Sequence, residues 1–226
     1  GDLMGGSTFL WKIKHNIIHH TYTNIDGLDD DIAKYPLFRL SPQQKPLWFH
    51  KYQYLYSIPL YFFTTINCIL FDDYWKLVTK KIHTTDIRTM KLHDHLEFWS
   101  GKLANLFLFL VIPIFIFGFW KAMLGFFVMH AALGLSLALV FQMAHAVEEA
   151  EFPVPNHDAK IENEWALHQV ATTVNFAMRN RVISWLVGGL NYQVEHHLYP
   201  KISHIHYPQI SKIVKQTCED LNIRYN

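Results

Sequence analysis

The sequence predicts an all-α protein in which a helical hairpin crosses a membrane and carries a polar helical cap with a histidine-rich site. Two apolar runs, 103–120 and 122–143, are each near the roughly 20 residues that cross a bilayer core. The mean hydropathy of +0.05 is too low for a chain made only of membrane spans and high for a soluble one. The 15 histidines are clustered, and clustered imidazoles commonly bind iron, copper or zinc.

The chain begins with Gly1 to Gly6, which contain no initiator methionine and no basic or apolar part of a signal peptide. We therefore expect it to begin inside a longer protein. From Trp11 to Thr23 the sequence predicts a helix that carries the first histidine cluster. An acidic loop, 24–31, and a proline-punctuated stretch follow this helix.

A moderately apolar run, 52–71, comes next and is interrupted by Pro59 and Asn67. We expect an interfacial or re-entrant helix here, with a full membrane span as the alternative. The two strong apolar runs then form a tight antiparallel hairpin, because in lipid only helices satisfy their own backbone groups. We place its turn at Lys121.

Basic residues in short loops mark the cytoplasmic side of a membrane protein. They occur before the hairpin, from Lys80 to Lys102, and after it, at Arg179, Arg181 and Lys201, whereas only Lys121 lies at the far turn. This bias predicts a multi-pass integral membrane protein with both flanks, and the histidine site, on the cytoplasmic face.

The chain contains no internal repeat, low-complexity tract or flexible linker, so we expect a single domain over 1–226. Twenty basic and 19 acidic residues give a net charge of +1. This balance offers no basic footprint for nucleic acid.

The motif H-N-I-I-H-H contains the first histidine cluster. On an α-helix, His15 and His19 lie one turn apart on the same face, and His20 lies about 100° further round. A chance trio is the alternative in so histidine-rich a chain, but three histidines on one short helix have few structural uses. The motif therefore predicts that one helix presents three imidazoles to a pair of metal ions.

The motif Q-V-E-H-H contains the second cluster. Gln193, His196 and His197 stand at positions i, i+3 and i+4, and so share one helix face. Glu195 points elsewhere, and we expect it to support the ligands or to lie on the surface rather than to bind metal.

Two further histidines are candidates on weaker grounds. His145 follows the second apolar run, where a lone histidine is usually a cap or a surface group, but the two clusters favour a ligand. For His168, ligation, support of a ligand and a plain surface position all stay open. The other histidines lack cluster spacing and are expected not to be ligands, although His130 inside an apolar run suggests a packing hydrogen bond; they are His50, His83, His93, His95, His130, His157, His204 and His206.

Iron bound mainly by neutral imidazole and open to dioxygen can remove hydrogen from an unactivated alkyl chain, which no side chain can do. A site at the membrane surface can draw an acyl chain from the bilayer while its polar head stays in water. Zinc-dependent hydrolysis would need fewer histidines. The pattern therefore favours oxidative chemistry on a lipid chain.

The two boxes, joined by a membrane hairpin, closely resemble the second and third histidine boxes of the membrane fatty acid desaturases. The most specific stretch is G-G-L-N-Y-Q-V-E-H-H-L-Y-P, residues 188–200. Its glutamine in place of the first histidine is the form of front-end and related acyl-lipid or acyl-CoA desaturases. The resemblance covers about residues 6–213.

This resemblance implies a centre of two iron ions, with O2 as co-substrate. The iron ligands that it implies are His15, His19, His20, His196 and His197, with His145 as the additional histidine that follows the last membrane helix. Gln193 takes a position that is histidine in other branches. Phe141 replaces the family's usual asparagine, which leaves a water-mediated contact open.

The family's first box, of the H-D-x-x-H kind, is missing from residues 1–226. We therefore expect the full-length protein to be active and this fragment alone to be inactive.

The resemblance also implies a fatty acyl substrate, carried as acyl-CoA or acyl-lipid, and an electron donor such as cytochrome b5 or ferredoxin. A fused cytochrome b5 domain with its H-P-G-G motif is absent from these residues, so a separate donor is the simpler expectation. The basic residues at 80–102 and 179–181 are either its docking surface or, the favoured alternative, simple topology signals.

Three other functions stay open. A hydroxylase or ketolase of the same superfamily would use the same oxidant but transfer oxygen to the chain. A membrane metal transporter or metal-binding protein would carry histidines inside its spans, where only His130 lies. A catalytically inactive relative would act only as a partner subunit.

Overall fold

The computed structural model describes residues 2–158, 160–161 and 163–226. These residues form two compact units, each built from two stretches of the chain. The first unit takes in the chain up to Ile17 and Leu47–Ala138, and the second takes in Ile18–Pro46 and Leu139–Asn226. Since the units interleave along the chain, a single domain over 1–226 stays a prediction.

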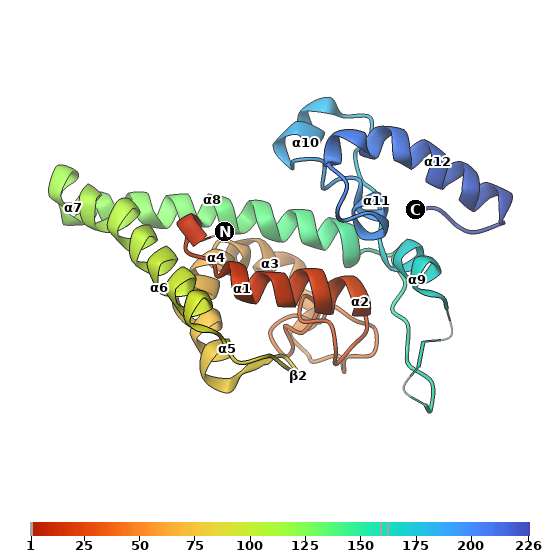
Figure 1. Ribbon diagram of the computed structural model, residues 1–226, viewed down its shortest axis with the longest axis horizontal. Coiled ribbons are helices and arrows are strands. Elements are labelled where there is room, and N and C mark those ends of the chain that lie inside the picture. The colour runs from red at the N-terminus through yellow and green to blue at the C-terminus, as the bar shows by residue number, and fades with distance from the viewer. Residues whose placement is uncertain (1, 159, 162) are drawn as a thin grey trace. The chain divides into compact units, whose positions relative to one another are not determined.

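The described residues are mostly helical, which confirms the predicted all-α fold class (Figure 1). The strands among them are two short ones in the first unit, β1 (Lys81–Ile82) and β2 (Thr85–Asp86), which pair antiparallel. Besides the long apolar helices, the helices of the first unit are η1 (Asp2–Met4), α1 (Thr8–Trp11), η3 (His50–Tyr52), α3 (Gln53–Tyr61), α4 (Thr64–Asn67), η4 (Cys68–Asp72) and α5 (Asp73–Thr79).

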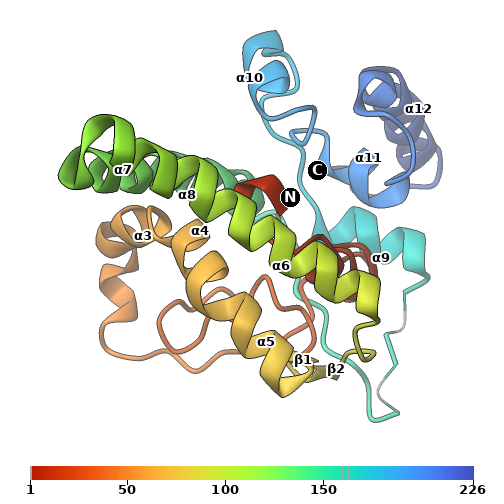
Figure 2. The same ribbon diagram turned by 60° about the vertical axis from the view of Figure 1, so that its left-hand side comes forward.

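Two long apolar helices confirm the predicted membrane hairpin. The first runs over Leu92–Phe117 as α6 (Leu92–Leu106), η5 (Phe107–Val111) and α7 (Ile112–Phe117), and the second is α8 (Phe119–His145). The helices have 26 and 27 residues, and an 18-residue window within each has a mean hydropathy of 2.0 and 2.1, so both are long and apolar enough to span a bilayer. The two arms diverge from a shared turn in both views (Figures 1 and 2). The chain is therefore that of a membrane protein.

The turn of the hairpin lies at Gly118, so the predicted turn at Lys121 is wrong. Gly118 has a φ of +83°, which glycine adopts without steric cost, and Lys121 lies inside α8. The helix that contains the apolar run 103–120 begins before this run, at Leu92.

Lys102 is a buried charge within this helix, directly before the apolar run. Its Nζ lies 2.6 Å from Asp73 Oδ2 and donates to the carbonyl oxygen of Ile69 at 3.1 Å. Lys102 and Asp73 are both buried, and a buried charge is tolerated when it is paired. The lysine therefore does not end the helix, although it lowers the local hydropathy.

The predicted interfacial or re-entrant segment 52–71 lies within a longer bent pair of helices. The arms His50–Tyr61 and Thr64–Thr79 meet at an angle of 70°. Pro59 lies close to the break, where its missing N–H weakens the helix. A straight third span over 52–71 is therefore not formed, and the re-entrant arrangement stays a prediction.

The bend packs against α8 through small and polar residues. A Cβ on Gly134 would lie 2.7 Å from the carbonyl oxygen of Tyr61, so only glycine fits there without a shift. Thr65 Oγ1 donates to the carbonyl oxygen of His130 at 2.8 Å, and His130 Nδ1 lies 3.3 Å from the same hydroxyl. The packing hydrogen bond expected for His130 is thereby confirmed.

The second unit contains the candidate site. Its elements are α2 (His20–Tyr22), the end of α8, α9 (Trp165–Thr172), α10 (Arg181–Leu186), α11 (Gln193–Leu198), η6 (His204–His206) and α12 (Tyr207–Asp220). A small apolar core of Val170, Val194, Val214 and Cys218 joins α9, α11 and α12. This core fixes α11, which carries the Q-V-E-H-H motif.

Candidate metal centre

The first histidine motif lies on η2 (Lys12–His19), which is a π-helix rather than the expected α-helix. A π-helix is wider than an α-helix and recurs at functional sites. The angle between His15 and His19 therefore differs from the α-helical one used in the prediction. His15 belongs to the first unit, and its role as a ligand stays a prediction.

Three imidazoles of the second unit converge on one point. His19, His145 and His197 come from η2, the last residue of α8 and α11, and each offers a nitrogen that lies within 4.8 Å of the others. Their ring centroids are 4.7 to 5.0 Å apart, and all three side chains are buried. Three imidazoles at this spacing can bind one transition-metal ion.

The Nδ1 atom of each of these rings faces a hydrogen-bond acceptor. His19 Nδ1 donates to the carboxylate of Asp29 at 3.0 Å, and His145 Nδ1 donates to the carbonyl oxygen of Thr172 at 3.3 Å. His197 Nδ1 donates to Gln169 Oε1 at 2.8 Å. Because these acceptors fix the tautomer, each Nε2 keeps its lone pair for a metal ion.

The Nε2 atoms of His145 and His197 are also available to bind a metal ion. Both atoms are buried, and neither has a hydrogen-bond partner among the described residues. A buried polar atom without a partner costs free energy unless a ligand binds it. A divalent metal ion fits this set of donors.

His20 and His196 form a second pair of imidazoles beside the first group. Their ring centroids lie 4.8 Å apart, and the His20 ring stacks on that of His197 at 4.2 Å. His19 and His20 are neighbours in the chain, at the end of η2 and the start of α2, but their rings belong to different groups. The same is true of His196 and His197 on α11. The second unit thus contains a group of three imidazoles with, beside it, a pair.

The protonation state of these rings suits metal binding. Burial, followed by repulsion from His196, lowers the pKa of His20 to about 3, and burial lowers the pKa of His196 to about 4. Burial and the neighbouring imidazoles hold the pKa of His197 well below its usual value. All three imidazoles are therefore neutral near pH 7, which is the form that binds metal.

Asn24 ties together the backbone segments that carry these ligands. Its fully buried Nδ2 lies 2.9 Å from the carbonyl oxygen of His145 and 3.3 Å from that of Thr172. Its own backbone N–H donates to Asp29 Oδ2 at 2.9 Å. One side chain thus fixes the end of α8 relative to the loop that follows the first box.

Glu195 is fully buried, so the surface position considered for it is wrong. Its carboxylate accepts hydrogen bonds from Asn175 Nδ2 at 3.0 Å and from the Tyr225 hydroxyl at 2.9 Å. Asn175 Oδ1 also accepts from the backbone N–H of Val194 in the first turn of α11. This network holds the short helix that presents His196 and His197.

We predict that Tyr225→Phe lowers the stability of the protein. The change leaves a buried carboxylate oxygen without its donor, which costs about 1.5–3 kcal/mol. Thermal unfolding of the purified full-length protein in detergent, followed by size-exclusion chromatography, measures the effect. Tyr54→Phe is the matched control, because Tyr54 is exposed. Equal melting temperatures for the two variants would contradict the role given to Tyr225.

The remaining candidates differ in their surroundings. Gln193 is buried in the first turn of α11, one turn before His196 and His197, as the spacing predicts. His168 is buried on α9, which excludes the plain surface position, and burial lowers its pKa. Among the described residues, it belongs to none of the histidine groups with metal-ligand spacing, and its role as a ligand stays a prediction.

The sequence did not identify the residues that orient the rings. Asp29, Gln169 and Asn24 are fully buried polar residues in contact with ligand segments. The acidic run after the first histidine motif, D-G-L-D-D-D, was the available signal for Asp29. Gln169 lies next to His168 and had no such signal.

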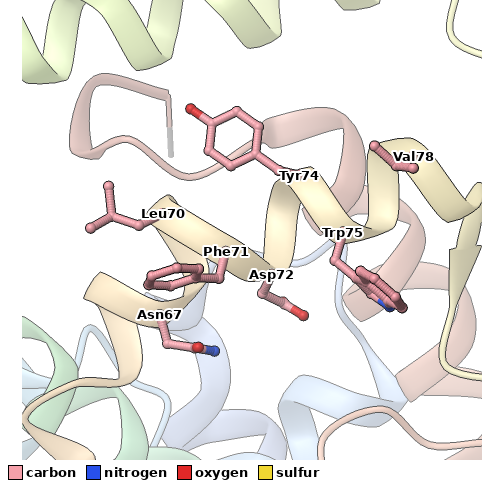
Figure 3. A pocket seen from close by; sticks show the side chains of 7 residues that line it. All are labelled: Asn67, Leu70, Phe71, Asp72, Tyr74, Trp75 and Val78. Carbon is pink, nitrogen blue, oxygen red and sulfur yellow. The ribbon is translucent and has the colours of Figure 1, made fainter.

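Two other features of the first unit do not form a site of this kind. Cys68, Asp72 and Asp73 have metal-ligand spacing, but Lys76 pairs with Asp72 at 2.7 Å and Lys102 with Asp73 at 2.6 Å. An open pocket of about 510 Å³ is lined by residues of η4 and α5 and by Asn67. Its side chains fan out from consecutive turns rather than converge on a point (Figure 3).

Comparison with known proteins gives a consistent result. The sequence profile described as fatty acid desaturase matches residues 2–226. The chain is 39% identical to the sn-1 linoleoyl-lipid 6-desaturase of Arthrospira platensis, over 99% of this chain and 61% of that protein. It is 36% identical to the acyl-lipid (8-3)-desaturase of Physcomitrium patens, over 99% of this chain and 47% of that protein.

A third similar protein is the delta(5) fatty acid desaturase A of Dictyostelium discoideum, at 32% identity over the whole of this chain and 50% of that protein. The chain thus spans about half to two thirds of the length of the curated relatives that it matches. No solved structure matches it.

Proposed function

Because this chain belongs to the fatty acid desaturase family, we propose that the full-length protein is a membrane enzyme that inserts a cis double bond into a fatty acyl chain. The observation that carries the proposal is the set of three buried imidazoles, each with its Nδ1 on an acceptor and its Nε2 turned to a common point. This arrangement suits a transition-metal ion.

We assign the metal ligands by group. One iron ion is held by His19, His145 and His197, and a second by His20 and His196. His15 and Gln193 are further ligands, and His168 is a supporting residue. When bound, the two iron ions would supply the oxidising power by which O2, two electrons and two protons, together with two hydrogen atoms from adjacent carbons, give the double bond and two molecules of water. The hydrogen bonds to Asp29, Gln169 and Thr172 hold the rings in place during this reaction.

The substrate class follows from the relatives and the membrane hairpin. Several of the relatives are named as acyl-lipid desaturases, which supports a lipid-linked acyl chain rather than a soluble carrier. The hairpin places the protein in the bilayer, where such a chain is available. We propose that the active site faces the cytoplasm, in agreement with the basic flanks of the hairpin. The electron donor, cytochrome b5 or ferredoxin, stays a prediction.

Gas chromatography with mass spectrometry of fatty acid methyl esters tests the proposal. Cells that express the full-length gene are compared with cells that express residues 1–226 and with cells that carry the empty vector. We expect new unsaturated species from the full-length gene alone, with the double-bond position read from the fragments. Hydroxylated species would favour a hydroxylase or ketolase, and an unchanged profile despite bound iron would favour a non-catalytic protein.

We predict that Gln193→Ala reduces activity less than His196→Ala does. Both side chains lie on α11, but a neutral amide is a much weaker iron ligand than imidazole. Product formed per unit of expressed full-length protein measures the difference. An equal loss in the two variants would show that Gln193 is an essential ligand or positioning group.

A further inference from the structure

The second unit carries an exposed apolar surface away from its imidazoles. Val182, Trp185 and Leu186 on α10 are 67%, 79% and 68% exposed. Ile202 and Ile205, in the loop after α11 and in η6, are 41% and 67% exposed. α10 lies at the periphery of this unit in both views (Figures 1 and 2). Large apolar side chains gathered in this way mark an interaction surface.

These two stretches lie in contact with each other. A Cβ on Gly189, three residues after α10, would lie 2.7 Å from the Cβ of His204. Gly189 has a φ of +77°, and its N–H donates to the carbonyl oxygen of Ser184 at 2.8 Å, which closes α10 with a tight turn. The turn therefore brings the end of α10 beside η6. We call the five apolar residues the α10 patch.

The exposed charged residues in the segment 175–205, which contains the α10 patch, are all basic. Arg179, Arg181 and Lys201 are exposed beside it. Glu195 is the only acidic residue between 175 and 205, and it is fully buried. A surface that combines exposed tryptophan and aliphatic side chains with arginine and lysine is complementary to the headgroup region of an anionic bilayer.

The chain connection places this unit at a membrane surface. The second unit includes Leu139–His145, the last two turns of the membrane helix α8. A unit that begins at the end of a span remains close to the lipid headgroups. Tryptophan is enriched at that depth, where its ring contacts both apolar and polar groups.

We propose that the α10 patch is a lipid-binding surface, which inserts into the interfacial layer of the bilayer while Arg179, Arg181 and Lys201 bind the headgroups of anionic lipids. The proposal is independent of the reaction assigned above. Five large apolar side chains in a segment, 175–205, with no exposed acid fit a lipid surface better than they fit an electron-donor protein, whose docking would rest mainly on charge.

A nitroxide label on Val182→Cys in the full-length protein tests insertion. The protein is placed in nanodiscs of phosphatidylcholine with and without phosphatidylglycerol, after removal of the other cysteines. Collision rates with O2 and with a water-soluble nickel chelate report depth. Glu219→Cys is the control, because Glu219 is exposed near the far end of α12. We expect the label at 182 to collide severalfold more with O2, and the label at 219 with nickel.

Equal access of nickel to both labels would overturn the proposal. So would protection of position 182 only after addition of a soluble, acidic electron-donor protein, because that result assigns the surface to a protein. In the variant Arg179→Gln, Arg181→Gln and Lys201→Gln, we expect the depth of the label at 182 to lose its dependence on phosphatidylglycerol. A dependence that persists would remove these three residues as headgroup ligands.

Discussion

His197→Ala in the full-length protein is expected to reduce desaturation to the level of cells that carry the empty vector, without preventing membrane insertion. His197 is the most enclosed of the imidazoles, and its ring lies within 5 Å of those of His19, His20 and His145. Its Nδ1 is fixed by Gln169, so that Nε2 points to the metal position. Removing the ring deletes one of three nitrogens for one ion and the stacking partner of His20.

Two measurements separate ligand loss from misfolding. Bound iron per purified chain should fall in His197→Ala, whereas the amount of protein in the membrane fraction should not. His157→Ala is the matched control, because His157 is exposed and outside both clusters. His19→Ala should behave as His197→Ala does. Desaturation retained in either cluster variant would remove that histidine from the ligand set.

The sequence predicts those features that are local in the chain. Two long apolar runs indicated the membrane hairpin, and the spacing of Gln193, His196 and His197 indicated one helix face; the structure has a helix at each place. Hydropathy did not show that the helix starts at Leu92, because residues 92–102 are polar, and it did not show that Asp73 pairs with Lys102 from 29 positions away. The turn was missed because the backbone of Gly118, and not the charge of Lys121, decides where the chain reverses.

Local patterns also do not reveal which polar residues orient a ligand. Gln169 reaches His197 across 28 positions, and Asn24 reaches His145 across 121. Residues of this kind follow no periodic sequence pattern, because a single hydrogen bond is enough to orient a ligand and any loop can supply it. The π-helix Lys12–His19 is a further case, because its sequence has the composition of an ordinary amphipathic helix. The sequence pointed to histidines that the structure brings together, whereas it did not point to the residues that hydrogen-bond to them.

Asp29→Asn is expected to lower iron affinity or activity about 10- to 100-fold, and Asp29→Ala to lower it further. The Asp29 carboxylate accepts from His19 Nδ1 and from the backbone N–H groups of Asn24 and Asp31. It is fully buried, so no water replaces it. An asparagine keeps one acceptor oxygen in the same place, whereas an alanine keeps none and leaves the ring of His19 free to rotate.

A purely structural role for Asp29 would reduce the yield of folded protein but leave the iron bound per folded chain unchanged. A positioning role predicts the opposite, with normal yield for Asp29→Asn, weaker iron binding on titration with a chelator, and altered Mössbauer parameters for the iron that remains. Asp158→Asn is the control, because Asp158 is exposed. Since the His19 ring can bind metal through Nε2 only while its Nδ1 carries the proton, the carboxylate that holds this proton determines whether the ring is a ligand at all.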